Sequence, residues 1–359
     1  MANSEWDTRA TENMMVLEDF VRAMPKVELH VHLEGSIRPT TLLKLAERNN
    51  VELPARTLDQ LRDFYRFTNF AHFIDVYSVI VRCLQAPEDF ALIVEELGAT
   101  MAQQNIRYAE VTWTPAPHVL RTGLPFTELL AGVNHGRKSV HSKYGVEMRW
   151  ITDIVRNQYA QGQDGMETAQ MAVAGREHGV VALGLGGLEQ GFPPELFTTA
   201  FDHARQNGLH SIPHAGEADG PASIWGALRS LHAERIGHGI RAIEDAALID
   251  YLREHQIPLE VCPTSNVCTG IVSHIGAHPI RQLYDAGVYV TVNSDDPPMF
   301  NTTLTDEYLA LVRDLNFSAT EIERLVLNAV RATLLDETTK QNMERAFQAE
   351  FAQLRLTSK

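Results

Sequence analysis

Short β-rich runs recur along the whole of this 359-residue chain, and helical patterns separate them. Each run ends in glycine, proline or polar residues that can form a loop. The eight candidate strands are residues 27–32, 106–113, 146–155, 180–187, 210–217, 235–240, 259–266 and 289–296. Strands that alternate with helices form parallel sheets, and closure into a barrel removes both exposed edges. We therefore expect an α/β fold, a (β/α)8 TIM barrel.

The main alternative is an open, doubly wound sheet that binds a dinucleotide. Its glycine-rich signature fails here, because the run GLGGLE has Glu189 where the third glycine should stand. Barrels of this length commonly form one unit, so we predict a single domain over residues 1–359. The segment 33–104 is too long for one crossover helix and predicts several helices inserted after the first strand.

That insertion carries six aromatic residues at spacings that place them on one or two helix faces. They are Phe64, Tyr65, Phe67, Phe70, Phe73 and Tyr77. Two interpretations are open: the rings pack against the barrel, or they form a lid over a flat aromatic substrate.

The charge balance excludes several classes of partner. Forty-six acidic residues against 31 basic ones give a formal charge of −15, and such a field repels nucleic acids and anionic lipid surfaces. The N-terminal stretch lacks the apolar core of a signal peptide, and no apolar run is long enough to span a bilayer. Cys83, Cys262 and Cys268 form no CxxC pair, which is typical of a reducing compartment. We expect a cytoplasmic protein without nucleic-acid or membrane partners.

Residues that can hold a metal stand at the ends of several candidate strands. His30 and His32 are one residue apart on the first strand, so both imidazoles project from the same face. His214 lies at the fifth strand and Asp295 at the eighth. Because strand ends converge at the C-terminal mouth of a barrel, these four residues suit one zinc ion per chain. The alternative for each histidine alone is a hydrogen-bonded position in the core.

Other residues at the mouth suit acid–base chemistry and substrate binding. His238, enclosed by two glycines, can orient or deprotonate an attacking water. Glu217 can protonate a substrate ring nitrogen if a partly dry pocket raises its pKa. If strand alternation holds, Asp295 and Asp296 point apart, so that one faces the metal and the other the substrate.

These residues stand in motifs that closely resemble those of the adenosine deaminase family of the amidohydrolase superfamily. The motifs are ELHVHLEG at 28–35, HAGE at 214–217, GHG at 237–239, CPTSN at 262–266 and NSDDP at 293–297. The resemblance implies a zinc site made of His30, His32, His214 and Asp295. It implies that Glu217 donates a proton to purine N1 and that His238 positions the attacking water. The implied substrate-binding residues are His32, Glu34 at the ribose 5′-hydroxyl, the Gly187 N–H at N3, and Asp296 at N7.

The implied reaction is the zinc-dependent hydrolytic deamination of adenosine and 2′-deoxyadenosine to inosine and 2′-deoxyinosine, with release of ammonia. Two departures from the family pattern concern the substrate. Glu34 stands where many members have Asp, and Leu188-Glu189 stands where two acidic residues are frequent. Free adenine, or a 5′-modified adenine nucleoside such as aminodeoxyfutalosine, is therefore the alternative substrate.

Two other classes of protein compete with this interpretation. A two-metal amidohydrolase would act on a cyclic amide or phosphoester and often bridges its metals with a lysine on the fourth strand, but VVALGLGGLE contains none. A non-catalytic barrel is disfavoured because both Glu217 and His238 are present. The sequence assigns no role to Cys262, Asp153 or Arg156, and it leaves the oligomeric state open.

Overall fold

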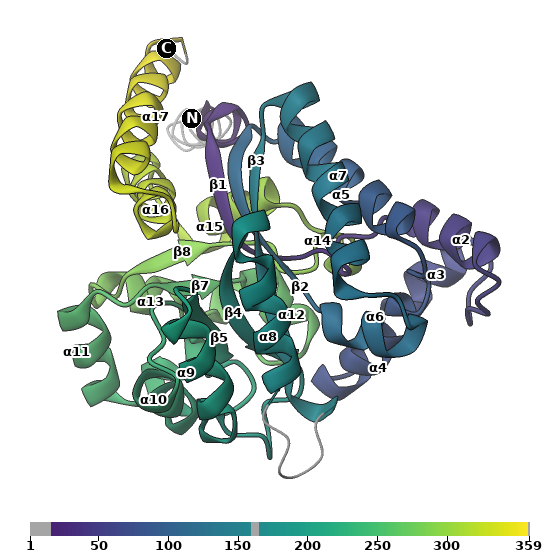
Figure 1. Ribbon diagram of the computed structural model, residues 1–359. Coiled ribbons are helices and arrows are strands. Elements are labelled where there is room, and N and C mark those ends of the chain that lie inside the picture. The colour runs from purple at the N-terminus through teal and green to yellow at the C-terminus, as the bar shows by residue number, and fades with distance from the viewer. Residues whose placement is uncertain (1–15, 159–164, 358–359) are drawn as a thin grey trace.

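In the computed structural model, which describes residues 16–158 and 165–357, eight parallel strands follow one another in chain order around a barrel (Figure 1). They are β1 (Lys26–His32), β2 (Ile106–Trp113), β3 (Glu147–Val155), β4 (Val180–Gly186), β5 (His210–Ala215), β6 (Ile236–His238), β7 (Leu259–Val261) and β8 (Val290–Val292). The segment after β8 meets β1 through one parallel bridge between Val31 and Asp295. The predicted (β/α)8 barrel is confirmed.

Helices surround the strands (Figure 1). Between β2 and β8 lie α6 (Pro115–Thr122), α7 (Phe126–Tyr144), η1 (Arg156–Gln158), α8 (Met166–Gly175), η2 (Arg176–His178), η3 (Pro194–Phe197), α9 (Thr198–Gln206), α10 (Pro221–Ser230), η4 (Ile240–Glu244), α11 (Ala246–His255), α12 (Pro263–Cys268), η5 (Ile275–Ala277) and α13 (Ile280–Asp285). After β8 come α14 (Pro297–Phe300), α15 (Leu304–Leu315), α16 (Ala319–Ala332) and α17 (Glu337–Thr357). Within the described ranges, no helix is long and apolar enough to cross a membrane.

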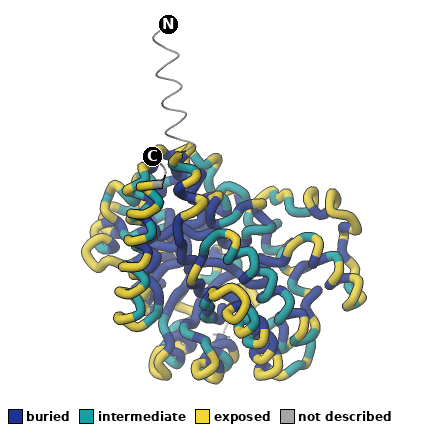
Figure 2. Tube along the Cα trace, turned by 90° about the horizontal axis from the view of Figure 1, so that it is seen from above, coloured by how far each residue is buried: buried dark blue, intermediate teal, exposed yellow. Residues whose placement is uncertain are grey.

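The sequence accounts for these outer helices through caps and apolar faces, as α16 shows. Ser318 and Glu321 form a capping box at its first turn, and one face that includes Leu325 is buried. Figure 2 shows the same polarity across the molecule, with buried residues in the interior and exposed residues along the outer helices.

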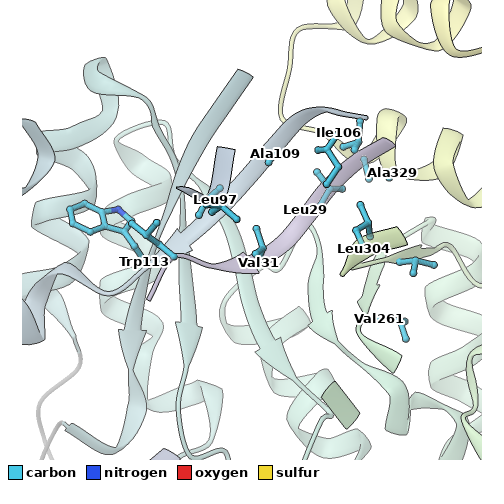
Figure 3. Packing of buried hydrophobic residues seen from close by; sticks show 14 of the residues in the cluster. Leu29, Val31, Leu97, Ile106, Ala109, Trp113, Val261, Leu304 and Ala329 are labelled. Atoms are coloured by element: carbon cyan, nitrogen blue, oxygen red, sulfur yellow. The ribbon is translucent and has the colours of Figure 1, made fainter. Parts of the chain in front are cut away.

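The strands present their side chains to two different environments, and β1 illustrates both. Leu29 and Val31 belong to the hydrophobic core, which also includes Leu97 of α5 and Ala329 of α16 (Figure 3). Because successive side chains of a strand face opposite sides, His30 points into the barrel. The apolar face of β1 thus packs outward against helices while its polar face supplies the site.

The segment 33–104 holds two kinds of helix. The predicted insertion consists of α2 (Pro39–Arg48), α3 (Leu58–Phe64) and α4 (Phe70–Val81). In contrast, α5 (Pro87–Gln103) is the first crossover helix and packs along α7. The two helices approach closely because α7 has a glycine at the contact: a Cβ on Gly132 would lie 2.4 Å from the Pro87 carbonyl oxygen. That residues 1–359 form one domain stays a prediction.

The predicted C-terminal ends of the first three strands are confirmed, but the predicted strands from β4 to β8 run past the ends that the structure shows. Residues 263–266, predicted as the end of the seventh strand, instead begin α12, because Pro263 occupies its first turn and has a φ suited to a helix. The chain turns at or just after three other strand ends through left-handed backbone at Gly216 (φ 70°), His238 (φ 59°) and Asp295 (φ 65°). These early turns place side chains around an opening instead of along a strand.

Candidate active site

A cavity of about 550 Å³ opens at the C-terminal mouth of the barrel, within the usual size range of small-molecule sites. The strand ends contribute His32, Asp153, Gly186, Gly187, His214, Glu217, His238, Asp295 and Asp296 to its lining. Helix α4 contributes Phe70, Phe73 and Tyr77, and the outer rim includes Arg82 and Arg121. The barrel therefore brings most of the predicted site residues to one opening.

The four predicted metal ligands converge in this cavity. The Nε2 atoms of His32 and His214 lie 3.3 Å apart, and Asp295 Oδ1 lies 3.3 Å from His32 Nε2 and 3.7 Å from His30 Nε2. His30 Nδ1 donates to Glu260 Oε2 at 2.9 Å, which leaves Nε2 as the nitrogen with a free lone pair. That buried Nε2 has no hydrogen-bond partner within the described residues. Three imidazole nitrogens and a carboxylate oxygen are a donor set that fits zinc.

A second geometric group of potential ligands includes Cys262. Burial raises the pKa of the Cys262 thiol well above its ordinary value, and nearby carboxylates, Asp295 first, raise it further. The thiol therefore stays protonated, and it donates to the Glu260 carbonyl at 3.6 Å. Because a metal binds the thiolate, we favour the histidine and aspartate set.

Asp295 is held in place by its backbone and by its side chain. Its N–H donates to the His30 carbonyl at 3.0 Å, and its own carbonyl accepts from His32 N at 2.9 Å. Its Oδ2 accepts from Ser265 Oγ at 2.6 Å. Burial opposes ionisation, but the adjacent His238, His32 and His30 outweigh it and lower the pKa of Asp295 to about 2.

Glu217 and His238 face each other, with Oε2 and Nε2 3.7 Å apart. Burial raises the pKa of Glu217 well above its usual range, and the negative charge of Asp295 raises it further. Burial also lowers the pKa of His238 to about 3. Burial thus favours the carboxylic acid form of Glu217, which can donate a proton, and the neutral imidazole form of His238, which can accept one.

Asp296 also lines the cavity, and its carboxyl group is buried with Oδ1 unpartnered among the described residues. Gly35 leaves room for it, because a Cβ at that position would lie 1.5 Å from Asp296 Oδ1. Burial, followed by the charge of Asp295, raises the pKa of Asp296 well above its ordinary value. The turn at Asp295, not regular strand alternation, directs the two carboxyl groups to different places.

Two predicted site residues, His30 and Glu34, are not part of the cavity lining, and Glu34 also lies away from the metal set. Its Oε1 accepts from Thr114 N and Oγ1, both at 2.9 Å, and pairs with His118 Nε2 at 3.1 Å. Tyr77 OH donates to its Oε2 at 3.5 Å. The carboxylate is thus fully buried and occupied by protein partners, which does not favour a contact with a ribose hydroxyl.

Some of the six aromatic residues of the insertion face the cavity, and some pack against the barrel. Phe70, Phe73 and Tyr77 line the cavity. Phe67 and Phe73 also pack against Phe300 of α14, with ring centroids 5.9 and 5.3 Å apart. Helix α4 therefore forms an aromatic wall that is anchored to the barrel.

Several residues that support the site went unassigned in the sequence. Asp153 Oδ2 lies 3.8 Å from His214 Nδ1. The glycine at position 184 of β4 makes room for Asp153, because a Cβ there would lie 1.8 Å from Asp153 Oδ1. Arg156 donates from Nη1 to the Phe192 carbonyl at 2.9 Å and from Nη2 to the His214 carbonyl. Glu260, which pairs with His30, was also unassigned. The signal in the sequence is strand alternation: in the run Leu259-Glu260-Val261, the middle side chain faces the opposite side from its two apolar neighbours.

Comparison with known proteins gives consistent matches over most of the chain. A model of the adenosine deaminase family matches residues 25–349. An aminodeoxyfutalosine deaminase from Streptomyces avermitilis is 40% identical over 344 residues, covering 93% of this chain and 94% of that protein. The adenine deaminase structure from Arthrobacter aurescens has a TM-score of 0.85 at 32% identity, covering 91% of this chain and 99% of that one. An amidohydrolase structure from Burkholderia ambifaria with bound zinc has a TM-score of 0.84 at 26% identity, covering 95% and 94%.

The barrel, with a cavity at its mouth that histidines and carboxylates line, has the fold of solved deaminases of the amidohydrolase type. The chain belongs to the adenosine deaminase family.

Proposed function

We propose that this protein deaminates a 6-aminopurine substrate by hydrolysis. The observation that carries the proposal is the pairing of Glu217 with His238, 3.7 Å apart, beside the histidine and aspartate set. Burial favours the protonated form of Glu217 and the neutral form of His238, and the addition of water to a protonated purine requires one proton donor and one proton acceptor.

We further propose that His30, His32, His214 and Asp295 hold one zinc ion. When bound, zinc lowers the pKa of a water from its bulk value to about 7. The surrounding residues orient the ligands: Glu260 fixes the His30 tautomer, and Ser265 fixes one carboxylate oxygen of Asp295.

In this scheme the chain supplies each proton transfer. Glu217 gives its proton to purine N1, which draws electrons from C6. His238 receives one proton of the water whose oxygen bonds to C6 and passes it to the C6 amino group, so that the C6–N bond breaks and ammonia leaves. The remaining hydroxyl proton returns to the Glu217 carboxylate, which leaves a 6-oxopurine protonated at N1. Asp296, kept protonated by burial, donates a hydrogen bond to N7, and the Gly187 N–H faces N3.

For the substrate we propose a 5′-substituted adenine nucleoside of the aminodeoxyfutalosine type, in place of adenosine and deoxyadenosine. The cavity extends beyond the metal set to the exposed Arg82 and Arg121, which would favour a substituent with a negative charge. The relative from Streptomyces avermitilis, named aminodeoxyfutalosine deaminase, supports this choice.

Free adenine is the second candidate. The Glu34 carboxylate, which the resemblance assigns to a ribose hydroxyl, is occupied by Thr114 and His118 and so leaves the sugar without that partner. The adenine deaminase from Arthrobacter aurescens, at 32% identity, supports this alternative.

The test is ammonia release by purified, zinc-loaded protein from aminodeoxyfutalosine, adenine, adenosine and deoxyadenosine, with a chelated sample as control. We expect aminodeoxyfutalosine to have the highest kcat/KM and chelation to abolish its turnover. The variant Arg82→Gln should raise KM for that substrate and leave KM for adenine unchanged. Preference for adenine would select the second candidate, and no turnover of any of the four by zinc-loaded protein would refute the proposal.

A further inference from the structure

The carboxylate of Glu189 is buried against the loop that follows β5. Its Oε1 accepts from Gly216 N at 2.6 Å and Ser223 Oγ at 2.5 Å, and its Oε2 accepts from Glu217 N at 3.2 Å and from Ala218 N and Asp219 N at 2.8 Å each. Four consecutive backbone amides therefore converge on one side chain. Hydrogen bonds to a charged acceptor are about twice as strong as neutral ones.

The loop conformation explains why the four amides can converge. Gly216 has φ 70°, a left-handed conformation in which successive N–H groups point to a common centre and bind an anion. A Cβ at Gly216 would lie 2.3 Å from Ile224 Cδ1, so glycine is needed there for space as well. The anion in this nest is the protein's own Glu189, supplied by the loop after β4.

The guanidinium group of Arg156 also joins the loop after β4 to the end of β5. Arg156, fully buried, donates from Nη1 to the carbonyl of Phe192, three residues after Glu189, and from Nη2 to the carbonyl of His214, three residues before Glu217. The loop after β4 and the end of β5 are thus held together by Glu189 and Arg156. Glu217 lies in the segment that these contacts fix.

We propose that Glu189 is a positioning residue that keeps the Glu217 carboxyl group aimed into the cavity. The inference rests on the proposed function, in which Glu217 is the proton donor. It requires a carboxylate specifically, because four of the five partners are backbone N–H groups, which can only donate. A glutamine would turn its NH2 group toward at least one of these amides and break that hydrogen bond.

The experiment compares Glu189→Gln with the wild type, using the zinc-loaded full chain and the preferred substrate. Because general acid catalysis contributes about 10² to 10⁴ in rate, partial misplacement of the donor should lower kcat at least about tenfold. We expect KM to stay within about threefold and zinc content to stay unchanged. The matched control is Glu195→Gln, an exposed carboxylate on the same connection, which should leave kcat unchanged.

Two further measurements separate positioning from general destabilisation. Hydrogen exchange of the amides at 216–219 should become faster in Glu189→Gln and not in the control. In a double-mutant cycle, Glu189→Gln should have little further effect on kcat once Glu217→Gln is present, because both changes act through one group. If Glu189→Gln does not yield folded protein, Ser223→Ala, which removes one of the five donors, should show a smaller fall in kcat at constant KM.

Wild-type kcat in Glu189→Gln, or a full additional loss of kcat in the Glu217→Gln background, would overturn the inference. So would unchanged exchange at 216–219. Failure of the proposed function looks different, because the wild type would then turn over no 6-aminopurine. The hydrogen-exchange comparison would still test whether Glu189 holds the amides at 216–219.

Discussion

The replacement Glu217→Gln tests the role of the proposed proton donor most directly. Glutamine keeps the volume and planar shape of the side chain, which is 7% exposed, but it has no acidic proton to give. Loss of general acid catalysis typically costs about 10² to 10⁴ in rate. At about 1.4 kcal/mol per tenfold change, the barrier should rise by about 3 to 6 kcal/mol.

Zinc binding should survive this replacement, because the converging donor atoms come from the three histidines and Asp295. The assay is the initial rate of ammonia release at saturating substrate, together with zinc content per chain. The exposed Glu195→Gln provides a carboxylate-to-amide control. A Glu217→Gln rate within about threefold of the wild type, with zinc retained, would remove Glu217 from the proton-donor role.

Three other replacements probe the support of the site. Glu260→Gln removes the carboxylate that orients His30, and zinc affinity measured by chelator competition should fall about 10- to 100-fold; unchanged affinity would contradict the pairing. Arg235→Met leaves two buried carboxylates without their cation, so urea unfolding should show a loss of about 3 to 5 kcal/mol, against under about 1 kcal/mol for the exposed Arg253→Met. Burial raises the pKa of Glu307 from 4.5 to about 7, so its contribution to stability is complete below pH 4.5 and is lost as pH rises through 7. The wild type should therefore lose up to about 3 kcal/mol of stability relative to Glu307→Gln between pH 5 and 8, and equal pH dependence of the two would refute the shift.

The barrel and the candidate metal ligands could be predicted because both leave local signals. Strands and helices alternate along the chain, and that alternation indicates a parallel sheet, which the missing dinucleotide signature and the removal of exposed edges favour as a closed barrel. His30 and His32 share a strand face whatever the rest of the chain does. Residues at strand ends such as His214 were expected to meet them because the topology of a barrel gathers those ends at one mouth.

The supporting contacts could not be predicted, since they join residues far apart in sequence through side-chain geometry. Glu189 reaches the amide of Gly216, 27 residues away, and Arg235 reaches Glu110, 125 residues away. Glu34 matched a family motif, yet its carboxylate is occupied by Thr114, 80 residues along the chain.

What the sequence determined by itself is the order of the elements and the chemical groups at their ends, because both follow from local periodicity. What the tertiary structure decided is where each strand stops, which polar groups are buried beside which partners, and hence which carboxyl groups have raised pKa values. The reason is physical: the pKa of Glu217 depends on its burial and on the charge of Asp295, 78 residues further along the chain. Both of these exist only once the barrel has closed.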